Sequence, residues 1–336
     1  MEKKYLKIFK EFGPSGDEEN ISNYLKELMK SFADKCYNDV LGNLICVKKS
    51  NSKNARNIML AAHMDQIGFI VTHIDKKGYL RFHSVGGHYP YNQVTQRVIF
   101  KNGIKGMICY DNEECLPKLK IDNLYVDIGA KNKEAAEKHI KIGDRFVWDT
   151  EPFEQFGNLC SMALDDRIGC LILILLAERL KAAKHNIYYV FTVQEEVGVR
   201  GAKTSAFAIE PDLGIALDVT GSDDAPGNQT KCSVSCAMGK GTGIKIMDSG
   251  IIVPKQIVDW EISLAEKHKI PYQREVLTGG ATDSFAIHLT KKGILASTLS
   301  VPTRHVHSSS EICSIADVEA TVKLLKVICE SEKLPV

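Results

Sequence analysis

The sequence lacks several features that would mark particular classes of protein. No run approaches the roughly 18 apolar residues that a membrane-spanning helix needs. The charged residues after Met1 do not lead into the apolar stretch of a signal peptide. The formal net charge is only +1, which gives no electrostatic basis for binding nucleic acid or an anionic membrane surface. We therefore expect a cytoplasmic protein with neither nucleic acid nor membrane as a partner.

Cysteine is present, but not in a pattern that implies disulfides or zinc fingers. The ten cysteines include no C-x-x-C pair and form no disulfide framework. Cys232 and Cys236 have no partners at zinc-finger spacing. We predict reduced thiols, as is usual in the cytosol.

Two kinds of pattern divide the 336 residues, which are enough for two domains. Apolar runs at 58–62, 187–193 and 213–217 are typical of strands buried on both faces of an α/β sheet. From 68 to 158 the chain instead shows short strands separated by turns, which indicates a small barrel or sandwich. The short strands are expected at 69–72, 79–82, 97–100, 105–108, 124–127 and 145–148.

The remaining elements fit an α/β chain on either side of an insertion. A Gly42-Asn43 turn predicts a hairpin over 39–47, and Ser314 is placed to cap the last helix. The other predicted helices span 17–32, 167–183, 253–268, 284–289 and 315–331, and further strands are predicted at 273–277 and 294–301. We therefore predict one discontinuous catalytic domain, 1–67 with 159–336, and an inserted β-rich domain, 68–158.

Potential metal ligands follow the predicted buried strands. The ends of parallel strands lie at one edge of a sheet, where open α/β proteins place their chemistry. An acid that caps a helix or ends a strand is common, so each residue alone also has an ordinary structural explanation. The candidates are His63 with Asp65, Glu195 with Glu196, Asp218, one of His305 and His307, and Asp165 or Asp166 before a helix.

Acids gathered at one edge would repel one another unless cations neutralise them. Two histidines and three carboxylates suit two divalent ions, for which we expect zinc, with cobalt and manganese as alternatives. Asp165 is the candidate to bridge ions ~3.5–4 Å apart. One of Glu195 and Glu196 is then left to carry a proton, and Asp65 can orient the His63 imidazole.

These motifs resemble those of the dinuclear metalloaminopeptidases of metallopeptidase family forty-two, the glutamyl and leucyl aminopeptidases that build tetrahedral particles. The resemblance rests on His63-Met64-Asp65, Ala163 to Arg167, Gln194 to Gly198, Asp218 and Arg304 to Ser308, which occur in that order. It implies a three-layer α/β/α zinc-exopeptidase-like catalytic domain with an inserted small β-barrel-like domain. It also implies that His63, Asp165 and Asp218 bind one metal, and that Asp165, Glu196 and His307 bind the other. Glu195 matches the catalytic base, and Asp65 matches the acid behind His63.

Two departures from the family pattern bear on substrate preference and assembly. The family commonly has a tryptophan after its Gly-Gly turn, whereas this chain has His88 after Gly86-Gly87. The segment 111–120 is short for the family. The resemblance implies dimers that pack into a twelve-subunit tetrahedron.

The resulting prediction is a metal-dependent aminopeptidase that removes the N-terminal residue of short unblocked peptides. A metal-dependent amidase or deacylase of similar core is the alternative. An inactive metal-stabilised scaffold is disfavoured, because loss of activity would most simply have removed Glu195 or a ligand, and all of these residues are present. An endoglucanase-type glycoside hydrolase needs only two carboxylates across a sugar cleft. The surplus of acids and the presence of only two tryptophans, Trp148 and Trp260, disfavour it.

Overall fold

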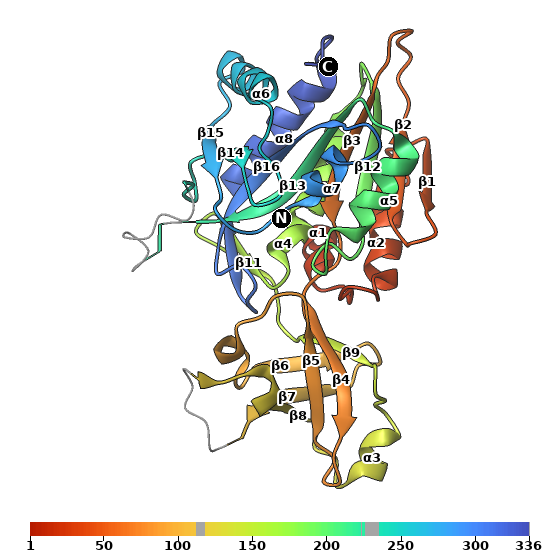
Figure 1. The fold of residues 1–336 in the computed structure, drawn as a ribbon, viewed down its shortest axis with the longest axis vertical. Coiled ribbons are helices and arrows are strands. Elements are labelled where there is room, and N and C mark those ends of the chain that lie inside the picture. The colour runs from red at the N-terminus through yellow and green to blue at the C-terminus, as the bar shows by residue number, and fades with distance from the viewer. Residues whose placement is uncertain (112–117, 223, 226–234, 336) are drawn as a thin grey trace.

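The computed structural model describes residues 1–111, 118–222, 224–225 and 235–335. Figure 1 shows an α/β part above and a β-barrel below it. No helix in these described residues is long and apolar enough to cross a membrane. Cys232 and most of the segment 111–120 lie outside them.

One eleven-stranded sheet forms the centre of the α/β part. Its strand order is β1-β2-β12-β3-β13-β16-β17-β11-β10, and β14 pairs with β15 and β16. Strands β12, β3, β13 and β16 run parallel. The strands are β1 Lys35–Asn38, β2 Leu44–Lys48, β3 Asn57–His63, β10 Phe153–Gln155, β11 Asn158–Ser161, β12 Asn186–Thr192, β13 Leu213–Gly221, β14 Thr242–Met247, β15 Tyr272–Val276, β16 Leu295–Arg304 and β17 Glu311–Ser314.

Helices cover both faces of this sheet, so the predicted three-layer α/β/α class is confirmed. Helices α2, α4 and α8 pack together on one face, and α5 and α7 pack together on the other. Residues 58–62 of β3 are fully buried, because a central parallel strand is covered on both sides. The helices are α1 Lys3–Leu6, α2 Glu19–Met29, α4 Leu164–Arg179, α5 Arg200–Ile209, α6 Lys255–Lys267, α7 Asp283–His288 and α8 Ile315–Glu330, with a 3₁₀ turn η1 at Lys7–Phe9.

The predicted short strands close into a six-stranded barrel in the order β4-β5-β8-β7-β6-β9. Phe69, Phe82 and Phe146 contact one another inside it, in an apolar core separate from that of the sheet. We therefore propose that the inserted unit is this barrel, which ends with β9, while β10 and the start of β11, within the predicted range 68–158, belong to the sheet. The elements of the inserted unit are β4 Gly68–Ile74, β5 Leu80–Val85, η2 Pro90–Gln93, β6 Arg97–Phe100, β7 Lys105–Tyr110, η4 Ile121–Asn123, β8 Leu124–Asp127, α3 Lys133–Glu137 and β9 Arg145–Trp148.

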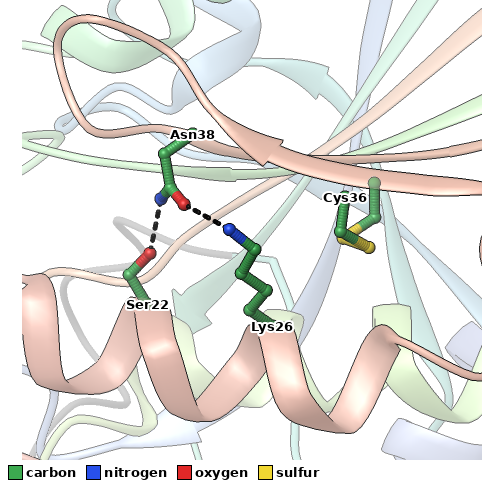
Figure 2. The surroundings of a disulfide bond; sticks show 5 residues. Ser22, Lys26, Cys36 and Asn38 are labelled. Carbon is green, nitrogen blue, oxygen red and sulfur yellow. Dashed lines mark hydrogen bonds between the residues drawn. A yellow bond between two sulfur atoms is a disulfide. The ribbon is translucent and has the colours of Figure 1, made fainter.

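The prediction that all cysteines are reduced is wrong for one pair. Cys36 and Cys46 form a disulfide between β1 and β2, a hairpin whose first strand lies before the predicted range 39–47. The two residues lie directly opposite each other in the antiparallel register, with 4.1 Å between their Cα atoms. Figure 2 shows this bond beside α2, where the Asn38 amide donates a hydrogen bond to Ser22 Oγ over 2.7 Å. A hairpin register is not visible in cysteine spacing, so the pair was missed.

Two strands of the sheet extend beyond their predicted ends, and one strand was missed. Strand β13 continues through Asp218 to Gly221, and β16 continues to Arg304, because the two strands pair in parallel along their whole length. Strand β17 was not predicted, because it has only four residues. Ser314 stands at the N-cap of α8, but its side chain makes no capping hydrogen bond.

Candidate metal centre

The predicted site residues are brought together from five separate segments. His63 ends β3, and Thr192, the last residue of β12, lies opposite it in the parallel register. Glu195 and Glu196 therefore follow directly beside the end of β3. Asp218, Asp165 at the start of α4 and His307 after β16 line one cavity of about 590 Å³ together with both glutamates.

Asp165 stands between the two histidines. Its Oδ1 lies 2.9 Å from His63 Nε2, and its Oδ2 lies 3.4 Å from His307 Nε2. The Oε2 atom of Glu196 lies 3.3 Å from the same His307 nitrogen. One ligand atom each from His63, Asp165 and Glu196 can be chosen so that all three lie within 4.8 Å of one another. His305, the other candidate histidine, is exposed.

The carboxylates of the centre lie close together in a largely buried site, and they raise one another's pKa. Burial, together with the negative charge of Asp165, raises the pKa of Asp218 well above its ordinary value. Burial also raises the pKa of Glu195, with Asp218 and Glu196 adding to the effect. The Oε1 atom of Glu196 is buried with no hydrogen-bond partner among the described residues. An unpaired buried oxygen on a carboxylate whose other oxygen lies 3.3 Å from His307 Nε2 fits a divalent cation such as zinc.

His63 has a fixed orientation. Its Nδ1 lies 3.1 Å from the backbone carbonyl oxygen of Asp65, so an N–H at this position donates to that oxygen and leaves Nε2 facing Asp165. The Asp65 carboxylate, which was expected to orient this ring, lies beside the same nitrogen, with its Oδ1 3.6 Å from His63 Nδ1.

The Asp65 carboxylate also holds the neighbouring loop. It accepts hydrogen bonds from the backbone N–H groups of Glu195 (3.0 Å) and Glu196 (3.3 Å) and from Ser15 Oγ (2.6 Å). Asp65 is fully buried, which would raise its pKa, but the neighbouring His63 ring, the Ser15 hydroxyl and the Glu195 N–H together lower the pKa below its ordinary value. One carboxylate thus fixes the positions of both glutamates.

Glu195 and Glu196 have different surroundings although they are neighbours. Glu196 contacts His307, whereas the nearest histidine nitrogen to Glu195 Oε2 is His63 Nε2 at 3.9 Å. Both side chains line the cavity. Glu195 is therefore free to exchange a proton with a molecule bound there.

Sequence reasoning missed Glu311, which supports the centre from β17. Its Oε2 accepts a hydrogen bond from the Asp165 backbone N–H (3.0 Å), and its Oε1 accepts one from the His307 backbone N–H (2.8 Å). Burial and the nearby charge of Asp165 raise the pKa of Glu311 to about 8. No periodic pattern marks so short a strand, so nothing in the sequence singled out this acid.

The sequence left open whether Asp165 or Asp166 caps the helix that follows, and Asp166 has this structural role. Its Oδ1 accepts a hydrogen bond from the Gly169 N–H (3.0 Å), as a helix-capping carboxylate does. Its Oδ2 accepts one from the His63 backbone N–H (3.2 Å), which ties the start of α4 to the end of β3.

The barrel reaches the centre through the turn that carries His88. The His88 ring packs against Phe69, with 4.2 Å between ring centroids, and its Nε2 lies 2.8 Å from the carbonyl oxygen of Gly68. A Cβ atom on Gly87 would lie 3.0 Å from His307 Nδ1, so glycine permits this close approach. Tyr89, the next residue after His88, lines the cavity.

A three-layer α/β/α domain with histidines and carboxylates around one cavity is the arrangement of a metal-dependent hydrolase. The sequence model of the M42 glutamyl aminopeptidase family matches residues 42–324. The chain belongs to this family, and it is an aminopeptidase of the metallo-exopeptidase class.

Individual relatives are similar over almost their full length. The chain is 44% identical over 319 residues to the "Putative aminopeptidase" of Acetivibrio thermocellus, covering 94% of this chain and 95% of that protein. It resembles the solved aminopeptidase from the archaeon Desulfurococcus kamchatkensis with a TM-score of 0.93 and 37% identity, covering 98% and 94% of the two chains. It also resembles the Pyrococcus horikoshii TET1 peptidase, which can assemble into a tetrahedron or a large octahedral shell, with a TM-score of 0.85 and 31% identity over 97% and 98%.

Proposed function

We propose that the chain removes the N-terminal residue from short unblocked peptides with the help of two divalent metal ions. The position of Asp165 carries this proposal, since its two oxygens face histidines from two different segments. His63, Asp165 and Asp218 would hold one ion, and Asp165, Glu196 and His307 the other. We expect zinc, and cobalt and manganese suit the same ligand types.

Two such ions would lower the pKa of a water molecule and polarise the substrate carbonyl. Glu195 takes a proton from the attacking water and returns it to the leaving amine. Asp65 keeps Glu195 in place through its backbone N–H, so the base does not depend on a mobile loop. The peptide bond is thereby broken with the addition of one water molecule.

The ligands of the proposed metal centre also favour an exopeptidase. A free α-amine is attracted to carboxylates and coordinates a metal, whereas an acetylated amine has no basic lone pair and adds bulk. Buried carboxylates with raised pKa values are typical of functional sites. Recognition of the free terminus therefore favours an aminopeptidase over the alternative amidase or deacylase.

We further propose self-association, as a dimer and as a larger particle. The barrel exposes Tyr91, Met107 and Ile142, with 58%, 46% and 66% of their surface accessible. The shells of the TET1 peptidase, a relative of similar fold, support assembly of this chain as well. A closed particle would admit short peptides and exclude folded proteins.

The test uses one peptide in free and acetylated forms, followed by mass spectrometry with and without a chelator. We expect stepwise loss of N-terminal residues from the free form only, and no cleavage with the chelator. Metal analysis of the same preparation should give two ions per chain. Equal cleavage of the acetylated form, or internal cuts, would contradict the exopeptidase proposal.

A further inference from the structure

The cavity has two chemically different parts. One part holds the charged groups, namely Asp165, Glu195, Glu196, Asp218 and His307. Every other described residue that lines the cavity is uncharged. We call these uncharged residues the wall, and its large members are Tyr89, Val199, Val219, Leu277, Phe285 and Val306.

Three separate segments fix this wall in place. Val219 is 6% exposed within β13, between Asp218 and Thr220, so the wall begins beside the metal centre. Leu277 follows β15, and its backbone N–H donates to the Met247 carbonyl over 3.0 Å. Phe285 lies in the first turn of α7, where Gly250 leaves room for it. A Cβ on Gly250 would stand 2.7 Å from that of Phe285.

The polar atoms of the wall are also neutral. The Thr282 hydroxyl lies 2.8 Å from Ser284 Oγ and 2.9 Å from Thr298 Oγ1, so it is already paired. The Thr220 hydroxyl has no partner among the described residues, but it carries no charge that could select an ionised side chain. A lysine or glutamate side chain placed against this wall would lose its hydration without gaining an opposite charge.

We propose that the wall around Leu277 and Phe285 selects an uncharged, apolar side chain at the N-terminal residue of the substrate. This inference rests on the proposed function, because it needs the α-amine of the substrate to lie against the charged part of the cavity. The side chain then extends toward the uncharged part of the cavity, as far as the described residues line it. Leucine and methionine fit the wall, whereas glutamate, lysine and arginine are rejected by the cost of an unpaired charge.

The test is a panel of aminoacyl-anilides carrying leucine, methionine, glutamate and lysine, measured on the metal-loaded protein. We expect kcat/KM for leucine and methionine to exceed that for glutamate and lysine by about 30-fold or more. Leu277→Lys should raise the glutamate-to-leucine ratio of kcat/KM by about 10-fold or more, because it supplies the missing opposite charge.

Two further variants separate charge from lost packing. Leu277→Gln should lower turnover of leucine without raising that of glutamate. Leu289→Lys adds the same charge on the far side of Phe285, at a residue that is 63% exposed and lines the neighbouring groove rather than the cavity. It should leave the ratio unchanged, and all three variants should retain the parent's metal content.

The outcomes distinguish this inference from the proposed function. If no aminoacyl substrate is cleaved, the proposed function fails. If the parent cleaves the glutamate or lysine substrate best, the enzyme is an aminopeptidase and only the inference about the wall is overturned. An equal change of ratio in Leu277→Lys and Leu289→Lys would also overturn it, because the effect would then come from surface charge.

Discussion

Glu311 fixes the backbone of Asp165 by accepting its N–H in a hydrogen bond of 3.0 Å, and both residues are buried. The second oxygen of the same carboxylate accepts the His307 N–H over 2.8 Å. Strand β17 therefore sets the distance between His307 and Asp165, the residue that faces both histidines. Glu311 touches neither imidazole ring in these contacts, so it acts through the backbone.

Glu311→Ala should weaken metal binding about 10- to 100-fold, because it removes both hydrogen bonds that hold the ligands in place. Glu311→Gln should have an intermediate effect, since an amide can accept only one of the two N–H groups. Titration calorimetry with Zn²⁺ measures the change. Parent-like affinity in the alanine variant would show that β17 holds the centre without this side chain.

Glu195 and Glu196 should separate in function although they are adjacent. Glu196→Gln should reduce metal occupancy, because a neutral amide is a poorer ligand than a carboxylate. Glu195→Gln should keep both metals and lower kcat by about 10²–10⁴-fold, since it removes the proton acceptor. Metal analysis and steady-state kinetics on the same samples check both results. A rate within a few-fold of the parent in Glu195→Gln would place the base elsewhere.

Asp165→Asn should weaken both metal sites together, because its two oxygens face different histidines. His63→Ala and His307→Ala should each weaken mainly one site. Stepwise metal release during chelator titration distinguishes one site from two. A fully active chain that contains only one ion would contradict the bridging role.

The sequence was sufficient to predict the layers of the fold and the residues that meet at the cavity. Buried parallel strands have a continuous apolar pattern, and their ends must lie at one edge, so His63, Glu195 and Asp218 could be placed together before any coordinates. Glu311 could not be placed, because its strand is defined by pairing with β11 and β16 rather than by its own residues. The Cys36–Cys46 bond was missed for the same reason.

Self-association should be visible in solution. Light scattering on the metal-loaded protein should give a mass of at least twice the 37.3 kDa of one chain. Contact with a second subunit would cover the exposed apolar side chains of the barrel. The matched comparison is the same protein after dialysis against a chelator. A purely monomeric protein in the presence of metal would contradict the assembly proposal.

The last prediction concerns Glu261, a buried acid in α6 away from the cavity. Its Oε1 accepts a hydrogen bond from Ser297 Oγ over 2.5 Å, and its Oε2 has no partner among the described residues. Burial raises the pKa of Glu261 to about 8, from an ordinary value of 4.5. Between these two values the folded protein binds a proton that the unfolded chain does not. Stability is therefore highest below about pH 4.5, as far as this group is concerned, and falls as the pH rises toward 8.

Glu261→Gln should remove this loss, because glutamine stays neutral at every pH and can still accept the Ser297 hydroxyl. We expect the free energy of unfolding of the variant to exceed that of the parent by on the order of 3 kcal/mol at pH 8.5, and to show no such gain at pH 4.5. Urea unfolding of both proteins at the two pH values measures the difference. Glu266→Gln, on the exposed face of the same helix, is the control and should change stability by less than about 0.5 kcal/mol. An equal gain at both pH values would show that the effect of Glu261→Gln does not come from its ionisation.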